Sequence, residues 1–319
     1  MGKVASAIIV WAMSKMSKKI AFGWYGGKFS HLDWLLPLLP ETTHYCEPFG
    51  GSAAVLLNRH PAPVETYNDI DGELVIFFRA LREQPDELIR AIGLTPFSRQ
   101  ELEIAATEPT QQLNNLERAR RFFVRARQVR TGLAQTASAG RWAHCLLTSR
   151  AGMAGAVSRW LGSVEDLPEI AQRLLRVQIE HAPAIEVIQR YDSPETLFYC
   201  DPPYPHDSRS DLKAYAYEMK DDDHRQLAEV LQSVQGKVAI SGYDSKLFNE
   251  LYSDWYRTEA LEKQIHSSKA MRQEVLWTNY DPATAEKKLI PVQYSNGHTK
   301  RQLRLLERRH KFMLPSCSF

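Results

Sequence analysis

An apolar segment, Thr196–Cys200, runs directly into Asp201-Pro202-Pro203-Tyr204, and this junction constrains the fold more than any other stretch of the chain. The apolar residues are typical of a buried strand. Proline has no N–H for a sheet ladder, so the strand has to end at Asp201. An acid, a fixed carbonyl and an aromatic ring are therefore expected together at the carboxyl end of a strand. That edge is where open α/β sheets bind ligands.

These groups suit chemistry on a planar amino group attached to a heterocycle. Such a nitrogen is a poor nucleophile because its lone pair is delocalised into the ring. The Asp201 carboxylate and the Pro202 carbonyl can each accept one N–H bond, which favours a geometry that frees the lone pair. Tyr204 offers a face on which a base can stack, a contact worth roughly 1–3 kcal/mol. A strand end with a solvated acid is the alternative, and we favour the functional interpretation.

Composition limits the classes of protein that fit. A chain of 319 residues suggests about two domains. The net charge is only +2, so a surface for nucleic acid has to be a local patch. The four cysteines form no C-x-x-C pair and have no histidine cluster beside them, so we expect neither a metal site nor disulfides, and a reducing cytoplasm fits.

The amino terminus carries a short apolar stretch, Val4–Met13, followed by basic residues. The stretch is too short to span a bilayer. Its charges follow the apolar run, which is the reverse of a signal peptide. We expect residues 1–17 to form a loose leader and the protein to have no membrane contact.

A nucleotide-binding strand-turn-helix unit is expected near the amino terminus. Tyr45–Glu47 is typical of a short strand, residues 48–52 of a glycine turn and Ala53–Asn58 of a helix. Glycine in such a turn lets the backbone approach a ligand. The spacing is not G-x-G-x-x-G, so a pocket for a nucleoside without phosphates is favoured over a pyrophosphate cradle. The next strand, Val64–Tyr67, ends beside Asp69, which is placed to hydrogen-bond ribose hydroxyls.

Four residues near these motifs have two interpretations each. Asp71 fits the cap of the following helix better than a ligand contact. Lys28 could pair with a ligand carboxylate, although a lysine after two glycines is a weak signal. Trp24 is equally compatible with the core and with a ring packed on a ligand. His224 follows three aspartates that indicate a helix start rather than a metal site.

Together these motifs resemble the Dam-like DNA adenine methyltransferases, which use S-adenosylmethionine. The matching pieces occur in the expected order: residues 23–28 (Gly-Trp-Tyr-Gly-Gly-Lys), 47–51 (Glu-Pro-Phe-Gly-Gly), 68–71 (Asn-Asp-Ile-Asp) and 201–204 (Asp-Pro-Pro-Tyr). The similarity continues through residues 217–231, 240–243 and 274–280, and covers roughly half the chain. Four motifs in order are far more specific than any one of them.

The resemblance implies an α/β fold, a Rossmann-like methyltransferase sheet with helices on both faces, plus an inserted, mainly α-helical target-recognition domain. The implied boundaries are residues 18–83 and 181–281 for the catalytic domain, 84–180 for the DNA-binding insertion and 282–319 for a basic tail. It also implies a cytoplasmic protein of a bacterium or a phage-infected cell that acts on double-stranded DNA. No obligatory protein partner is evident.

The resemblance also assigns roles by position. Lys28 would lie near the cofactor carboxylate, Asp69 would hold the ribose, and Asp201 would face both the cofactor amino group and the target amine. The turn has Gly50-Gly51-Ser52 where variants of F-x-G-x-G are usual. The implied catalytic residues are Asp201, Pro202, Pro203 and Tyr204. The implied cofactor contacts are Trp24, Lys28, Glu47, Phe49, Gly50, Gly51, Asp69 and Asp201.

The expected reaction moves a methyl group to the exocyclic amine of an adenine that is flipped out of the duplex. No metal and no covalent cysteine are needed for it. A methyltransferase for cytosine amino groups in DNA, or for RNA, is one alternative. A nucleic-acid-binding relative without activity is another, and the intact Asp201 and Tyr204 argue against it.

The middle of the chain has an arginine-rich segment, residues 118–130, whose apolar residues fall on one helical face. Only Glu117 lies nearby in sequence, so ion pairing is expected to be poor and contact with DNA phosphates is favoured over a solvated helix face. The loop from 131 to 160 adds further arginines. The expected DNA contacts are Arg118, Arg121, Arg125, Arg127, Arg130 and Arg141.

Overall fold

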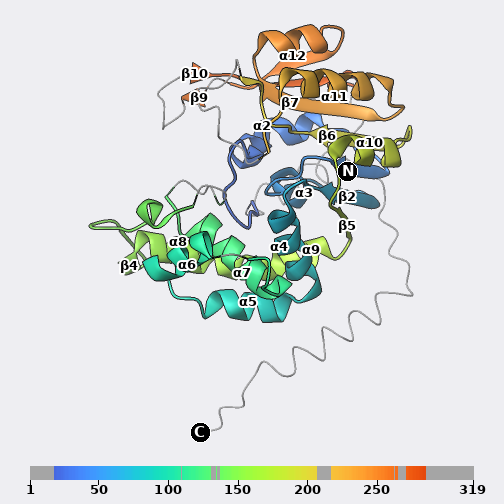
Figure 1. Ribbon diagram of the computed structural model, residues 1–319. Coiled ribbons are helices and arrows are strands. Elements are labelled where there is room, and N and C mark those ends of the chain that lie inside the picture. The colour runs from blue at the N-terminus through green and yellow to red at the C-terminus, as the bar shows by residue number, and fades with distance from the viewer. Residues whose placement is uncertain are drawn as a thin grey trace, which may run out of the picture.

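The computed structural model describes residues 18–108, 110–130, 134, 137–206, 217–261, 263–264 and 271–284 (Figure 1). Its centre is a seven-stranded sheet of order β5-β2-β1-β6-β7-β11-β8. The first five strands in this order are parallel, and β11 is antiparallel to both of its neighbours. The strands are β1 (His44–Glu47), β2 (Val64–Asn68), β5 (Val177–Glu180), β6 (Thr196–Cys200), β7 (Lys237–Tyr243), β8 (Tyr256–Glu259) and β11 (Glu274–Thr278).

The centre of the sheet forms where the sequence predicted a strand. Every residue of β6 is buried, as a strand covered on both faces requires. Its parallel neighbours are β1 on one side and β7 on the other. After β1 the chain turns away to β2, while β6 returns on the opposite side of β1. The order therefore reverses between β1 and β6, which is the switch point where open α/β sheets bind ligands.

Helices cover both faces of the sheet, as expected. Alternate residues of β6 point to opposite faces, so Leu197 and Tyr199 join one apolar cluster while Phe198 and Cys200 join the other. The first face is covered by α2 (Leu32–Leu35), α3 (Ala54–Asn58) and α4 (Gly72–Glu83). The second is covered by α10 (Ala184–Tyr191), α11 (Asp221–Ser233) and α12 (Lys246–Leu251). The two short 3-10 turns flanking α2 are Lys28–His31 and Leu36–Leu38.

The insertion is mainly helical and packs directly on α4 (Figure 1). Phe77 of α4 stacks on Phe123 of α7, with ring centroids 5.6 Å apart, so the insertion shares its core with one face of the sheet. The elements are α5 (Pro85–Gly93), α6 (Arg99–Thr107), α7 (Asn115–Arg127), a 3-10 turn (Ala139–Arg141), β3 (Ser149–Arg150), β4 (Met153–Ala154), α8 (Gly155–Glu165) and α9 (Leu167–Leu174). A further hairpin pairs β9 (Lys263–Gln264) with β10 (Met271–Arg272).

The expected carboxyl boundary of the insertion, residue 180, is wrong. Val177–Glu180 is strand β5, which pairs in parallel with β2 and belongs to the sheet. The segment alternates apolar and polar residues over only four positions, so its sequence carries little strand signal. The loose leader, residues 1–17, and the tail from 285 onward lie outside the described residues. No helix in the described ranges is long and apolar enough to cross a bilayer.

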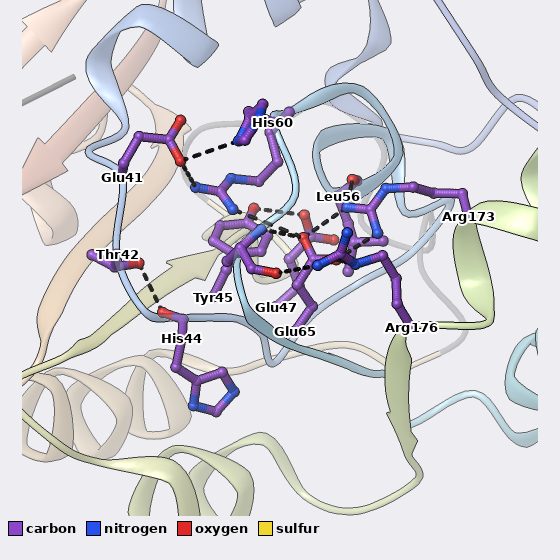
Figure 2. Close-up of polar contacts among 12 residues, drawn as sticks. Glu41, Thr42, His44, Tyr45, Glu47, Leu56, His60, Glu65, Arg173 and Arg176 are labelled. Carbon is purple, nitrogen blue, oxygen red and sulfur yellow. Dashed lines mark hydrogen bonds and ion pairs between the residues drawn. The ribbon is translucent and has the colours of Figure 1, made fainter. Parts of the chain in front are cut away.

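A buried ion cluster fastens the last helix of the insertion to the sheet (Figure 2). Glu65 of β2 is fully buried, and its two carboxylate oxygens accept hydrogen bonds from Arg173 of α9 at 2.5 and 2.7 Å. Arg176 lies 3.5 Å from the same carboxylate. Arg59 lies 3.9 Å from it and also covers the Tyr45 ring at 4.0 Å. A buried carboxylate with several cationic partners holds this junction together.

Candidate active site

A cavity of about 420 Å³ opens at the carboxyl ends of β1, β2 and β6. Each of the four sequence motifs contributes to its wall, through residues 24–28, 47–52, 68–71, and 201 with 203. Parallel strands bring their carboxyl ends to one edge, so motifs far apart in the chain meet there. All eight residues expected at the cofactor line this cavity: Trp24, Lys28, Glu47, Phe49, Gly50, Gly51, Asp69 and Asp201.

The turn after β1 requires its two glycines. A Cβ on Gly50 would lie 2.2 Å from a carbon of the Tyr67 ring. Gly51 has a φ of +49°, and a Cβ there would lie 3.0 Å from the Trp24 indole. The Gly51 N–H donates to the Asp69 carboxylate at 2.8 Å. The indole of Trp24 therefore serves both uses considered from the sequence, because it packs on the core and also lines the cavity.

Two acids in the cavity wall have pKa values well above their ordinary range. Burial raises the pKa of Glu47 to about 8, although the Tyr45 hydroxyl donates to its carboxylate at 2.7 Å (Figure 2). Burial also raises the pKa of Asp69 to about 6, against the stabilising N–H groups of Asp71 and Gly51. Both carboxyls would ionise more readily beside a positive charge, so the wall favours a cationic ligand.

Lys28, at the wall of the cavity, lies at the centre of a buried polar cluster. Its Nζ is 2.6 Å from Asp201 Oδ1, 2.5 Å from the Tyr204 hydroxyl and 3.2 Å from Glu274 Oε1. Burial lowers the pKa of Lys28, but Asp201 and Glu274 outweigh it and the net shift is upward. In this structure the ammonium is bound to the two acids, and its contact with a ligand carboxylate stays a prediction.

Asp201 is fixed through one of its two oxygens. Oδ1 hydrogen-bonds Lys28 at 2.6 Å and the Ser241 hydroxyl at 3.0 Å, and the Tyr204 hydroxyl lies 3.2 Å away. Burial raises the pKa of Asp201, while the charge of Lys28 opposes the rise. All of these contacts are made by Oδ1, and within the described residues Oδ2 makes no hydrogen bond. The carboxylate thus has a fixed orientation and a second oxygen available at the edge of the cavity.

Tyr204 adopts a different position from the one expected. Its side chain is 2% exposed, and its hydroxyl donates to Glu274. The ring packs edge-to-face on Tyr243 at 4.7 Å, and neither Pro202 nor Tyr204 is among the described lining residues, whereas Pro203 is. The prediction of an exposed stacking face is wrong for this arrangement, because hydrogen bonding draws the phenol into the Lys28 cluster.

Sequence reasoning missed Glu274, the acid that completes this cluster. It is the first residue of β11, where all five residues are buried, and its exposed fraction is 4%. A carboxylate directly before the apolar run Val275–Trp277 was the available signal, because such a group is almost never buried without a partner. Two interpretations made from the sequence, Asp71 as a helix cap and His224 at a helix start, are confirmed. Asp71 caps α4 by accepting from Glu73 N and Leu74 N. Buried His224 lies in the first turn of α11.

The expectation of poor ion pairing among the arginines of α7 is wrong. Arg118 pairs with Glu73 at 2.6 Å, and Arg120 pairs with Glu117 and Glu101 at 2.7 and 2.9 Å. Arg121 and Arg125 also have carboxylate partners, in Glu117 and Glu108 for the first and in Glu73 for the second. Apart from Glu117 on α7 itself, the acids come from α4, from α6 and from the residue after α6, so the local sequence does not reveal them. For Arg118, Arg121 and Arg125 this pairing weighs against the predicted DNA contact.

The other three predicted DNA contacts, Arg127, Arg130 and Arg141, lie at or beyond the end of α7. Arg130 and Arg141 are exposed and Arg127 is half-buried. Arg127 donates to the Arg159 carbonyl at 3.2 Å, and Arg130 donates to the Trp142 carbonyl at 3.3 Å. Their contact with DNA stays a prediction.

Comparisons with known proteins agree with the motifs. Residues 24–273 match the family model of the D12 class N6 adenine-specific DNA methyltransferases. The chain is 25% identical over 282 residues to the type II methyltransferase M1.LlaDCHI of Lactococcus lactis subsp. cremoris, covering 81% of this chain and 94% of that protein. It is 26% identical over 253 residues to a DNA adenine methylase of Vibrio cholerae serotype O1, covering 74% and 86%.

A solved structure of a Haemophilus influenzae protein assigned as a methylase aligns over 80% of this chain and 88% of that chain. Its TM-score of 0.30 and sequence identity of 11% carry no argument about the fold. The family match is the deciding comparison because it spans most of the chain. The protein belongs to the D12 class N6 adenine-specific DNA methyltransferase family, as the resemblance predicted.

Proposed function

We propose that this adenine-specific DNA methyltransferase takes its methyl group from S-adenosylmethionine and transfers it to the exocyclic amine of an adenine flipped out of duplex DNA. One observation carries the proposal. The eight expected cofactor residues line a single cavity, and Asp201 stands at its edge with one oxygen fixed and the other available.

The cavity fits such a methyl donor. Its volume of about 420 Å³ is in the usual range for small-molecule sites, roughly 300–1,000 Å³. S-adenosylmethionine, when bound, supplies a methyl group already activated by its sulfonium charge. Asp69 would accept hydrogen bonds from ribose hydroxyls, and the Glu47 carboxyl would face the positively charged methionine part. The glycines of the turn leave space for the ligand to approach the backbone.

Asp201 carries the chemistry on the acceptor side. Its Oδ2 would accept one N–H bond of the adenine amine and the Pro202 carbonyl a second, which holds the nitrogen with its lone pair directed at the methyl group. As the new N–C bond forms, the bond between the methyl group and the sulfonium sulfur breaks and leaves a neutral thioether. The nitrogen then has one proton too many, and Oδ2 would receive it. The protein contributes mainly position and electrostatics to this transfer.

Because Tyr204 is held by Lys28 and Glu274, stacking on the base would require the phenol to leave that cluster. The duplex would be bound by the helical insertion, α5 to α9, which packs on the catalytic sheet through α4. Flipping the base costs a few kcal/mol, which contacts to the rest of the duplex have to offset.

The test is transfer of labelled methyl groups from S-adenosylmethionine to duplex DNA, with identification of the modified base. Wild-type protein is expected to yield N6-methyladenine. Asp201→Asn keeps the size of the side chain but removes its charge, and should lower the transfer rate by roughly 10²–10³. Normal methylation by that variant would contradict the assignment.

The matched control is Asp244→Asn, because Asp244 also follows a sheet strand directly, is exposed, and lies outside the described cavity lining. It should methylate as the wild type does. Formation of methylcytosine, or transfer to RNA alone, would favour the alternative substrates instead.

A further inference from the structure

A second cavity, of about 290 Å³, lies on the insertion where α7 ends against the start of α8. Three arginines and one histidine supply its charged and titratable groups: Arg127, Arg130, Arg159 and His144. Its other described lining residues are small and apolar, and no carboxylate is among them. Arg159 and His144 are additions to the residues that the sequence singled out.

The arginines of this cavity differ from those earlier on α7. Arg118, Arg120, Arg121 and Arg125 each have a carboxylate within 4 Å. Arg127, Arg130 and Arg159 make no ion pair within the part of the chain that the structure describes. Among the described residues, the guanidinium groups of Arg127 and Arg130 donate to the backbone carbonyls of residues 159 and 142.

Three cationic groups converging without an acid are electrostatically unfavourable. Burial lowers the pKa of Arg127, and the charge of Arg159 lowers it further. The carboxylate that acts on Arg127 most strongly, Asp166, already pairs with Lys19 at 3.5 Å. A bound anion would relieve the repulsion, and guanidinium groups match the oxygens of a phosphate particularly well.

The surroundings favour a polymer over a free anion. Arg141 and Arg150 are exposed on the segments next to the cavity and extend its positive charge over the surface. Arg130 N donates to the Arg141 carbonyl at 2.9 Å, which joins that exposed arginine to the rim. A basic surface continuing beyond one phosphate-sized cavity suits a chain of phosphates.

We propose that Arg127, Arg130 and Arg159, with His144, form a binding pocket for one phosphodiester of the DNA backbone. The proposal rests on the proposed function, in which duplex DNA is the substrate, and it separates the arginines of α7 into two groups. Those before residue 126 stabilise the fold through ion pairs, whereas the last one joins residues from the following loop and from α8 in contacting DNA.

The test is equilibrium binding of a fluorescent duplex to the full-length protein at several salt concentrations, without a methyl donor. The variants are Arg127→Gln, Arg130→Gln and Arg159→Gln, singly and together. Each single variant should weaken binding roughly tenfold, the usual effect of losing a charge-assisted hydrogen bond. The triple variant should reduce the slope of log K against log salt by about one, the loss of one neutralised phosphate.

Arg79→Gln is the matched control, because Arg79 is an exposed arginine on α4 that pairs with Glu83. It should change neither affinity nor slope. A salt slope that is unaltered in the triple variant would overturn the proposal, provided that its melting temperature matches the wild type.

A second measurement changes the DNA rather than the protein and needs only one variant, Arg159→Gln, beside the wild type. Single methylphosphonate linkages, which lack the phosphate charge, are placed along the duplex one position at a time. One position should weaken binding by wild-type protein and have no effect on Arg159→Gln. Either of two results would assign the pocket to a free anion instead. The first is that no position along the duplex behaves in this way. The second is that inorganic phosphate raises the melting temperature of the protein while the salt slope of duplex binding stays unchanged. DNA binding without methyl transfer would contradict the proposed function and leave this pocket intact.

Discussion

The protonation of Glu47 gives a quantitative prediction about stability. Burial raises the pKa of this carboxyl to about 8 in the folded protein, from an ordinary value of 4.5. Between these values the folded state holds a proton that the unfolded chain has released. Stability must therefore fall as pH rises through this window, because the unfolded state binds fewer protons. The contribution is fully present below the unfolded pKa and is lost as pH passes the folded one.

The size of the effect follows from the two pKa values. One full proton corresponds to about 1.4 kcal/mol per pH unit. Allowing for partial ionisation near the folded pKa, Glu47 should remove about 2–3 kcal/mol of stability between roughly pH 5.5 and 7.5. Asp69, with a folded pKa of about 6, acts in the same direction but mostly below that value. Its contribution cancels when variants that retain it are compared.

The measurement is urea unfolding of the wild type and of Glu47→Gln across this pH range. Glutamine keeps an oxygen that can accept the Tyr45 hydroxyl, so the main change is the lost titration. As pH rises through this range, the free energy of unfolding of Glu47→Gln should increase relative to that of the wild type by the amount given above. Glu229→Gln, at an exposed position of α11, serves as the control and should follow the wild type. A difference that stays constant with pH would refute the reasoning.

Two further predictions concern the active site and its turn. Glu274→Gln removes a charge that raises the pKa of both Asp201 and Lys28. The acidic limb of the rate–pH profile should therefore move to lower pH, and a methyl-transfer assay across pH would detect this shift. Gly50→Ala places a Cβ 2.2 Å from the Tyr67 ring and should destabilise the fold by about 1–3 kcal/mol in urea unfolding. Its control is Gly162→Ala, at a helical position with open space around it, which should be neutral or stabilising. An unshifted profile, or equal effects of the two alanines, would contradict these expectations.

The features that the sequence predicted well are local ones. The apolar run of β6 and the prolines after it define a strand end without reference to any other part of the chain. The glycine turn after β1 is similarly local, because the positive φ of Gly51 is a property of a few neighbouring residues. Since parallel strands bring their carboxyl ends together, these local features predicted that the turns meet at one edge of the sheet. The individual residues that share the cavity were implied by the family resemblance.

The features that could not be predicted depend on partners distant in sequence. Arg118 meets Glu73 from a helix 45 positions earlier, and Tyr204 meets Glu274, which lies 70 positions later. Neither pairing leaves a periodic signal in the sequence. An arginine-rich helix with acids elsewhere in the fold is therefore indistinguishable, by sequence alone, from one that awaits phosphates. The short strand β5 was missed for a related reason, since its pairing with β2 defines it more than its own residues do.

The cluster around Asp201 explains why the proposed mechanism needs a second acid. Attack by the adenine amine places positive charge on the nitrogen, which a carboxylate stabilises best when it is not fully neutralised. Lys28, 2.6 Å from Asp201, would by itself make a neutral pair. Glu274, 3.2 Å from the same ammonium, shares that positive charge and leaves the three groups with a net negative charge when both acids are ionised. Lys28 can then fix the orientation of Asp201 through Oδ1 without cancelling its attraction for the developing cation, so orientation and charge are supplied by different residues.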